Sequence, residues 1–118
     1  MKVLVVDDDQ LTLQAIGHCL NQEGYYISLS EDVTKALHVL ENEKIDLIIS
    51  DIMMPHISGL GFLSVLKEFY FGKIPVILIS SLDKEDVIAN SHSLGADKFL
   101  TKPIDMKELL QCVNTILK

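Results

Sequence analysis

The chain has 118 residues, 48% of them hydrophobic, which suits one domain with a buried core that needs no disulfide or metal staple. Its formal net charge of −7 argues against direct binding of this domain to nucleic acid or anionic lipid, because phosphate contacts need a basic surface. No apolar run approaches the roughly 20 residues of a membrane span, and the acidic start lacks the flanks of a signal peptide. Cys19 and Cys112 are expected to be free thiols in a reducing cytoplasm.

Five short runs of aliphatic and aromatic residues predict strands. In chain order they cover Lys2–Val6, Tyr25–Leu29, Asp46–Ser50, Pro75–Ser80 and Lys98–Thr101. The first, third and fourth runs are almost unbroken aliphatic, as is typical of central strands buried on both faces. The second and fifth are more mixed, which indicates edge strands.

Helical spacing of apolar residues follows each of these runs. The five predicted helices are marked by Leu13, Ile16 and Leu20; by Ala36, Leu37 and Leu40; by Phe62, Leu63, Leu66 and Phe69; more weakly by Val87, Ile88 and Ser91; and by Leu109, Leu110, Val113 and Ile116. Asp9 is a candidate N-cap, and Asp105 with Glu108 is a candidate capping box for the last helix. Gly24 and Gly95 fall just past helix ends, where a left-handed residue is favoured.

The strict alternation of strand and helix predicts a parallel sheet with right-handed crossovers and helices on both faces. We therefore expect an α/β fold of the flavodoxin-like (βα)5 type, a doubly wound five-stranded parallel sheet in the order 2-1-3-4-5. Residues 1–118 would form this single domain. In such sheets a ligand lies beyond the carboxyl ends of the strands, at the switch point between strands one and three.

Polar residues follow the ends of four predicted strands. They are Asp7, Asp8 and Asp9 after the first, Asp51 after the third, Ser80 and Ser81 at the end of the fourth, and Lys102 with Pro103 after the fifth. Each has an ordinary explanation by itself, such as a helix cap, a turn residue or a solvated lysine. Their arrival at one edge of the sheet instead favours a functional site.

The carboxylates of this site require a counter-charge. Two carboxylates about 4 Å apart repel each other by about 1–4 kcal/mol, depending on the local dielectric constant. Lys102 supplies one positive charge, which does not balance Asp7, Asp8 and Asp51 together. Because the available ligands are all oxygens, the sequence favours Mg²⁺ or Mn²⁺ over zinc.

A divalent cation, a spare carboxylate, a hydroxyl and a lysine together suit phosphoryl transfer. The cation and the lysine neutralise phosphoryl oxygens, and the hydroxyl donates a hydrogen bond to another. A carboxylate can act as the nucleophile and form an aspartyl phosphate. Asp51, on the central strand, is the best candidate for that role.

At this point the chain resembles the receiver domain of two-component response regulators, over essentially its whole length. The resemblance rests on the acidic pair Asp7–Asp8, the D-x-x-M-P-x-x-x-G pattern from Asp51 through Met54 and Pro55 to Gly59, the hydroxyl residue Ser80 followed by Ser81, and the pair Lys102–Pro103. Each of these features is weak alone, but the ordered set is specific.

The resemblance implies a role for each residue of the acidic pocket. Asp51 would accept phosphate from the phosphohistidine of a histidine kinase. Asp8 would bind Mg²⁺ directly and Asp7 partly through water. Asp51 and the backbone carbonyl of Met53 would complete the protein ligands.

The remaining motif residues would hold or report the phosphoryl group. Lys102 would bind a phosphoryl oxygen, Ser80 would bond the group once it arrives, and Phe99 matches the switch aromatic. The Lys102–Pro103 bond is expected to be cis, and Gly59 is expected to permit a tight turn into the third helix. Such a domain takes up and slowly loses phosphate but is not a turnover enzyme.

Three other classes of protein compete with this interpretation. Asp7-x-Asp9 after a buried strand resembles the nucleophile loop of haloacid-dehalogenase-type phosphatases, although Asp51 and Lys102 then have no role. A flavin-binding flavodoxin would need a Ser/Thr/Gly-rich phosphate loop where this chain has three aspartates. A phosphate-independent pseudo-receiver usually lacks parts of the acidic set that is present here.

The partners are only partly indicated. A histidine kinase or phosphotransfer protein would be the donor, and the fourth helix, fifth strand and fifth helix are the usual output surface of the family. The sequence leaves open a stand-alone regulator or the first domain of a longer one, and a monomer or a weak phosphorylation-dependent dimer. Met53 and Leu82 would flank the path of a hydrolytic water, which predicts slow loss of phosphate.

Overall fold

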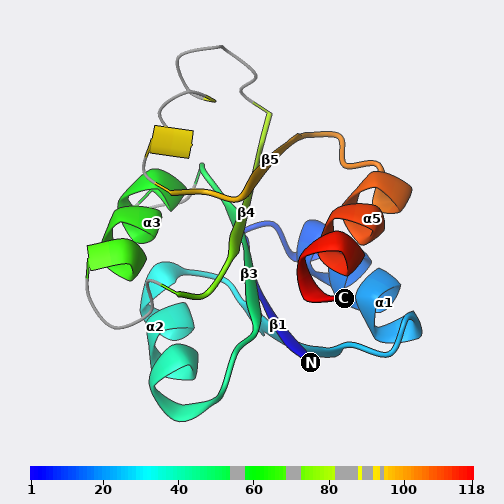
Figure 1. Cartoon of the computed structure of the whole chain (residues 1–118), viewed down its shortest axis with the longest axis horizontal. Coiled ribbons are helices and arrows are strands. Elements are labelled where there is room, and N and C mark those ends of the chain that lie inside the picture. Colours follow the sequence, from blue (N-terminus) through cyan, green and yellow to red (C-terminus); the bar gives the residue numbers. More distant parts are fainter. Residues whose placement is uncertain (54–57, 69–72, 82–87, 89–91, 94) are drawn as a thin grey trace.

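The computed structural model describes residues 1–53, 58–68, 73–81, 88, 92–93 and 95–118. Its elements, in chain order, are β1 (Lys2–Val6), α1 (Gln10–Gln22), β2 (Tyr26–Ser30), α2 (Val33–Asn42), β3 (Leu47–Asp51), α3 (Gly59–Glu68), β4 (Val76–Ser80), β5 (Lys98–Thr101) and α5 (Met106–Leu117). All strand pairs are parallel, and the sheet has the order β2-β1-β3-β4-β5 (Figure 1). The predicted flavodoxin-like topology and its two edge strands are thereby confirmed.

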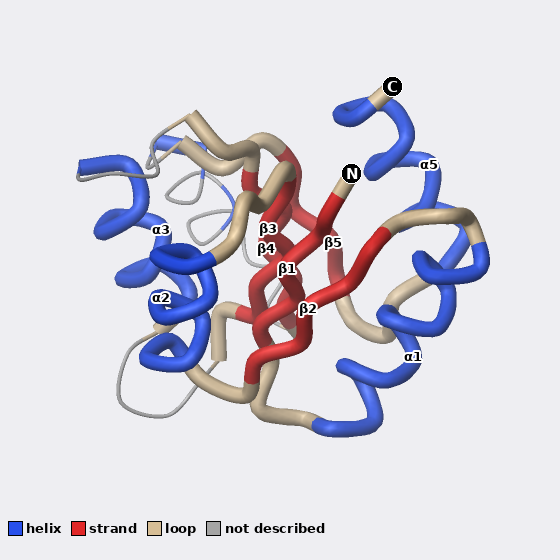
Figure 2. The backbone as a smooth tube through the Cα atoms, turned by 90° about the horizontal axis from the view of Figure 1, so that it is seen from below, coloured by secondary structure: helices blue, strands red, loops and turns tan. Residues whose placement is uncertain are grey.

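The helices cover both faces of the sheet (Figure 2). Alternate residues of each central strand point to opposite faces, so the core divides into two clusters. Leu4, Ile48 and Leu78 pack with side chains of α2 and α3, whereas Ile49 and Ile77 pack with those of α1 and α5. The three central strands, β1, β3 and β4, are thus buried on both sides, which holds their carboxyl ends rigidly.

Three of the predicted strands have boundaries that shift by one residue. The backbone N–H of Tyr25 donates to Leu20 O at the end of α1 rather than to the sheet, so β2 begins at Tyr26. The side chain of Asp46 accepts a hydrogen bond from the Lys2 backbone N–H, and the strand begins after it. The same strand, β3, extends to Asp51, which was expected just beyond its end. The strand β4 begins at Val76 rather than at Pro75.

The predicted helix ends have their expected local structure. Asp9 and Asp105 are N-caps whose carboxylates accept backbone N–H bonds in the first turn. The Asp105 carboxylate accepts a hydrogen bond from the Glu108 N–H at 3.4 Å, which is half of the predicted capping box. Gly24 and Gly95 have φ values of 92° and 101°, the left-handed conformation in which glycine is favoured.

Most of the predicted fourth helix lies outside the described residues, as does Phe69 of the third. Within the described part of the chain, no helix combines the length and apolar character needed to cross a membrane.

Candidate functional site

Two buried aspartates lie at the carboxyl ends of neighbouring strands. Asp7 directly follows β1 and is fully buried, and its backbone N–H donates to Ser30 O at 3.1 Å. Asp51 is the last residue of β3, and it is 3% exposed. Since β1 and β3 are paired in the sheet, both carboxylates occupy the switch point of the topology.

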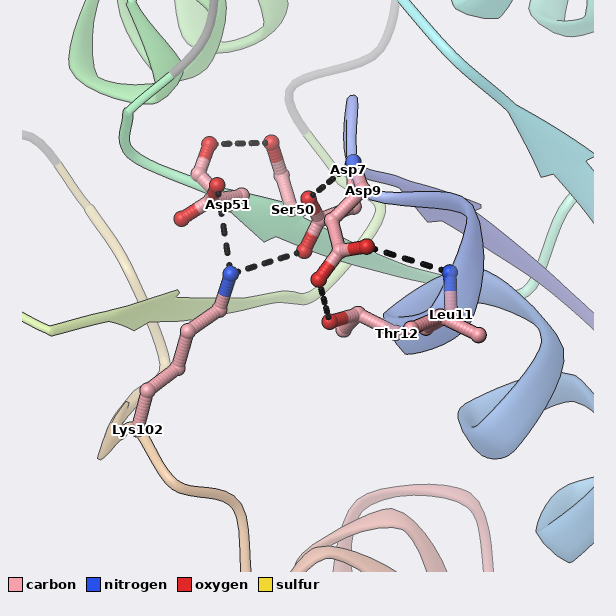
Figure 3. Close-up of polar contacts among 7 residues, drawn as sticks. All are labelled: Asp7, Asp9, Leu11, Thr12, Ser50, Asp51 and Lys102. Carbon is pink, nitrogen blue, oxygen red and sulfur yellow. Dashed lines mark hydrogen bonds and ion pairs between the residues drawn. The ribbon is translucent and has the colours of Figure 1, made fainter.

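Lys102 links these two carboxylates (Figure 3). Its ammonium Nζ lies 3.1 Å from Asp7 Oδ2 and 3.4 Å from Asp51 Oδ2. Lys102 directly follows the edge strand β5. Its backbone N–H donates to Ser80 O at 2.8 Å, which fixes the position of its Cα atom beside the end of β4. The peptide bond from Lys102 to Pro103 is cis, the isomer that the resemblance implied.

Asp8 adds a third carboxylate at the solvent side. One carboxylate oxygen from each of Asp7, Asp8 and Asp51 lies within 4.8 Å of the others, and Asp8 is exposed. An all-oxygen set with an open side suits a hard cation that keeps several water ligands, as Mg²⁺ does. The chemistry of these residues therefore fits the predicted cofactor.

The electrostatics of the pocket perturb two groups. Burial and the charge of Asp7 raise the pKa of Asp51 to about 6, although Lys102 and a hydrogen bond from the Met53 backbone act in the opposite direction. Burial lowers the pKa of Lys102, but the hydrogen bond to Asp7 and the charges of Asp51 and Asp7 outweigh it and raise the pKa overall. One lysine thus leaves the pocket short of positive charge.

Ser80 and Phe99 lie on the two strands next to this pocket. Ser80 is fully buried at the end of β4, where it pairs with Thr101 of β5. Phe99 pairs with Leu78 and packs, partly buried, against the core cluster shared by α2 and α3. The structure therefore places the hydroxyl residue beside the pocket and the aromatic residue along the adjacent edge strand.

Gly59 is present because there is no room for a side chain. A Cβ built on it would lie 2.2 Å from Asp51 O and 2.7 Å from Ile52 Cα, both backbone atoms. Its N–H donates to Ile52 O at 2.8 Å. The first turn of α3 is therefore pressed against the end of β3, a close approach in addition to the expected turn.

Met53 follows Asp51 by two residues, and its side chain is 56% exposed. Its backbone N–H bonds the Asp51 carboxylate, whereas the proposed metal role of its carbonyl stays a prediction. Met54, Pro55 and Leu82, which the sequence also singled out, lie outside the described residues.

The geometry of Asp9 argues against the phosphatase interpretation. Its carboxylate caps α1, where it accepts hydrogen bonds from the Leu11 N–H at 3.1 Å and the Thr12 hydroxyl at 2.8 Å (Figure 3). These bonds lower the pKa of Asp9. A carboxylate engaged in this way is a helix cap rather than the second acid of a nucleophile loop.

Sequence reasoning missed two contributors to the pocket. The buried Ser50 hydroxyl donates to Asp51 O at 3.1 Å, and the Asp9 N–H donates to Asp7 Oδ1 at 2.9 Å. The signal for Ser50 was a hydroxyl inside an otherwise aliphatic run. Nothing in the sequence indicated which oxygen the Asp9 backbone would bind.

A doubly wound parallel sheet with carboxylates and a bridging lysine at its switch point defines the class of aspartate-centred receiver domains. Comparison with known families agrees: the model of the response regulator receiver domain matches residues 3–114. The chain therefore belongs to the response regulator receiver domain family.

Curated relatives extend over the whole chain. The nisin biosynthesis regulatory protein NisR of Lactococcus lactis is 31% identical over 117 residues, which cover 99% of this chain and 50% of NisR. The chemotaxis protein CheY of Treponema pallidum is 33% identical and is covered to 83%. The chain spans about half the length of several of the curated relatives it matches.

Solved structures match the whole fold. The receiver domain of the Francisella response regulator 1452 has a TM-score of 0.92 and 33% identity, covering 98% of this chain and 94% of its own. The Vibrio cholerae chemotaxis protein CheY4 has a TM-score of 0.91 and 27% identity, with 98% of both chains covered.

Proposed function

We propose that Asp51 accepts a phosphoryl group from the phosphohistidine of a histidine kinase or phosphotransfer protein. The observation that supports this most is the Lys102 ammonium within 3.1 Å of Asp7 and 3.4 Å of Asp51. A positive charge held there, at the mouth of a buried carboxylate pair, is placed to receive a phosphoryl oxygen. The domain acts as a stoichiometric acceptor rather than as a turnover enzyme.

In the transfer step, a carboxylate oxygen of Asp51 attacks the phosphorus atom in line with the bond to the donor imidazole. The phosphorus–oxygen bond forms, the phosphorus–nitrogen bond breaks, and its electron pair returns to the imidazole. Lys102 then exchanges its contact with Asp51 for a phosphoryl oxygen. Asp7, Asp8, Asp51 and the Met53 carbonyl would hold Mg²⁺, which when bound would supply further charge neutralisation.

The test uses acetyl phosphate with Mg²⁺ and the intact mass of the protein. The unchanged protein should gain one phosphoryl group, and Asp51→Asn should gain none. Asp9→Asn is the matched control, because it alters a carboxylate that caps α1 and should still allow labelling. Phosphate on another residue of the unchanged protein, or in the Asp51 variant, would contradict the proposal.

A groove beside Lys102 is suited to the donor protein. Leu11, which is 77% exposed, and Ala15 of α1 line it together with Pro103 and Ile104. An apolar rim next to the acceptor can exclude water as a donor histidine approaches. We expect Leu11→Glu to slow transfer from a phosphohistidine protein and to leave labelling by acetyl phosphate unchanged.

Phosphorylation would shift a pre-existing equilibrium through Ser80 and Phe99. The Ser80 hydroxyl would move to the phosphoryl group and vacate space into which the Phe99 ring turns.

The change would reach an output protein or domain through the surface of β5, α5 and the residues before β5. A groove lined by Asp97, Lys98, Glu108 and Gln111 lies on this side. The output would lie in a further domain, as the length of relatives such as NisR suggests, or in a separate protein, as the length of CheY suggests.

A further inference from the structure

The two edges of the sheet differ in how they are protected. Edge strands present unpaired backbone groups, and charged residues, lysine above all, commonly shield them from joining another sheet. The edge strand β5 begins with the exposed Lys98. The other edge strand, β2, contains no charged residue and no proline, and it exposes Tyr26 to 72% and Leu29 to 43%.

The unprotected edge continues onto a surface that carries little charge. Among residues 10–30, which form α1 and β2, Glu23 is the single Asp, Glu, Lys or Arg, in a chain whose residues are 23% charged. A groove of about 490 Å³ separates the two elements, and Gln14, His18 and Asn21 line its α1 side. On a molecule of net charge −7, a second acidic copy meets few opposing carboxylates at this surface.

The backbone of β2 defines which groups are open. The Tyr26 N–H donates to Met1 O, and Ser30 O accepts from the Asp7 N–H, so residues 26, 28 and 30 face β1. In a parallel ladder the intervening residues face the opposite way. Ile27 and Leu29 therefore direct both their N–H and C=O groups outward, toward the free edge.

We propose that this chain self-associates weakly through antiparallel pairing of β2 with β2 of a second copy. In the register centred on Ser28, Ile27 of each copy lies opposite Leu29 of the other, and every outward N–H and C=O group is satisfied. The two-fold axis puts α1 of both copies on the same face of the joined sheet, so surfaces that carry little charge meet. The contact is isologous and closes as a dimer.

The association is expected to be weak and dependent on salt. Two short strands bury less than the roughly 1,600 Å² of a standard stable interface. Each copy also carries a net charge of −7, so the repulsion between copies is screened as ionic strength rises. Sedimentation velocity from micromolar to millimolar protein, at low and at high salt, should show a dimer that strengthens with salt.

The variant Leu29→Lys tests the surface directly. It adds to β2 the kind of charge that protects β5, and it lowers the net negative charge, so weaker association cannot come from greater overall repulsion. We expect a loss of about tenfold or more in dimer affinity, equivalent to about 1.4 kcal/mol. Gln111→Lys, on exposed α5 beside the opposite edge, adds the same charge and should leave the dimer intact.

Hydrogen exchange distinguishes edge pairing from any other dimer. The amides of Ile27 and Leu29 should exchange more slowly as the protein concentration rises, whereas those of Tyr26 and Ser28, already bonded to β1, should not change. A monomer at all concentrations and both salt levels overturns the proposal. So does a dimer that Gln111→Lys disrupts and Leu29→Lys does not, because that dimer uses the β5–α5 side.

Discussion

At the scale of the residue, the pocket is dominated by a carboxylate that is costly to ionise. Asp51 is buried next to the fully buried Asp7, and the ammonium of Lys102 only partly compensates the two charges. The same shortage of positive charge would favour a divalent cation and, after the proposed transfer, the contact of Lys102 with a phosphoryl oxygen. The proposed function and the cost of ionising Asp51 therefore have one physical source.

The stability of the metal-free protein should depend on pH through Asp51. Its pKa rises from 3.8 to about 6 on folding, so the native state binds this proton more tightly than the unfolded chain. The free energy of unfolding should therefore fall as the pH rises from about 4 to about 6, by up to about 3 kcal/mol from this residue.

Denaturant unfolding in EDTA measures this dependence. Asp51→Asn should remove that part of the slope and be more stable than the unchanged protein at pH 7. The difference between the two pH profiles isolates Asp51 from the other titrating groups. Parallel profiles would mean that Asp51 ionises at its ordinary pKa.

The exposed Met53 is expected to slow the loss of phosphate. Its thioether offers little hydrogen bonding to a water that attacks in line, and Leu82 is expected to act in the same way. Replacing Met53 by Asn and Leu82 by Glu should accelerate decay of the phosphoryl form. The decay rate after removal of the phosphodonor decides this; equal rates would show that these side chains do not control the water.

At the scale of the element, the position of α3 against β3 depends on one missing side chain. Gly59→Ala would drive a Cβ into the backbone at Asp51 and Ile52, with a cost of about 1–3 kcal/mol. The displacement of Asp51 should also slow labelling by acetyl phosphate. Both can be measured on the same sample, by denaturant unfolding and intact mass.

Gly17→Ala is the matched control for that substitution. Its Cβ would meet the end of the Leu29 side chain at 3.3 Å, a contact that a flexible side chain can relieve, and alanine favours the helix. This variant should label normally and lose little or no stability. Equal effects of the two substitutions would contradict the special role of the Gly59 contact.

The strands β4 and β5 are expected to carry the switch. Ser80→Ala should still accept phosphate but should lose the response at Phe99, because the hydroxyl that moves is absent. The chemical shifts of the Phe99 ring before and after phosphorylation measure the response, and Ser81→Ala, an exposed neighbour, is the control. A full response in the Ser80 variant would place the coupling elsewhere.

At the scale of the whole molecule, Mg²⁺ should stabilise the fold. A ligand that binds the native state at tenfold excess over its Kd adds about 1.4 kcal/mol to the free energy of unfolding, which corresponds to a rise of several degrees in Tm. Asp8→Asn should abolish this rise without lowering the metal-free Tm, because Asp8 is exposed.

Thermal scans with Mg²⁺ and with KCl at matched ionic strength separate metal binding from screening of the net charge of −7. A rise in Tm that persists in Asp8→Asn, or that KCl reproduces, would exclude a specific site at the three carboxylates. A larger rise in Tm with Zn²⁺ than with the same concentration of Mg²⁺ would contradict the all-oxygen ligand set.

The sequence by itself determined the topology and the edge at which the site lies. Unbroken aliphatic runs such as Val3–Val6 have few alternatives to a strand buried on both faces, and strict alternation with helices leaves a parallel sheet as the outcome. Since parallel strands end at the same edge, Asp7, Asp51 and Lys102 were predicted to meet before any distance was known. These are properties of local pattern and chain connectivity.

Only the tertiary structure decided what depends on contacts between distant segments. The pKa of Asp51 reflects burial and the nearby Asp7 charge, and the requirement for Gly59 reflects the backbone of β3 pressed against α3. The start of β2 moved because Tyr25 bonds the end of α1. The run of residues 10–30, in which Glu23 is the single charged residue, acquired meaning only when folding placed α1 beside an unprotected edge strand, because exposure and pairing are properties of neighbours in space.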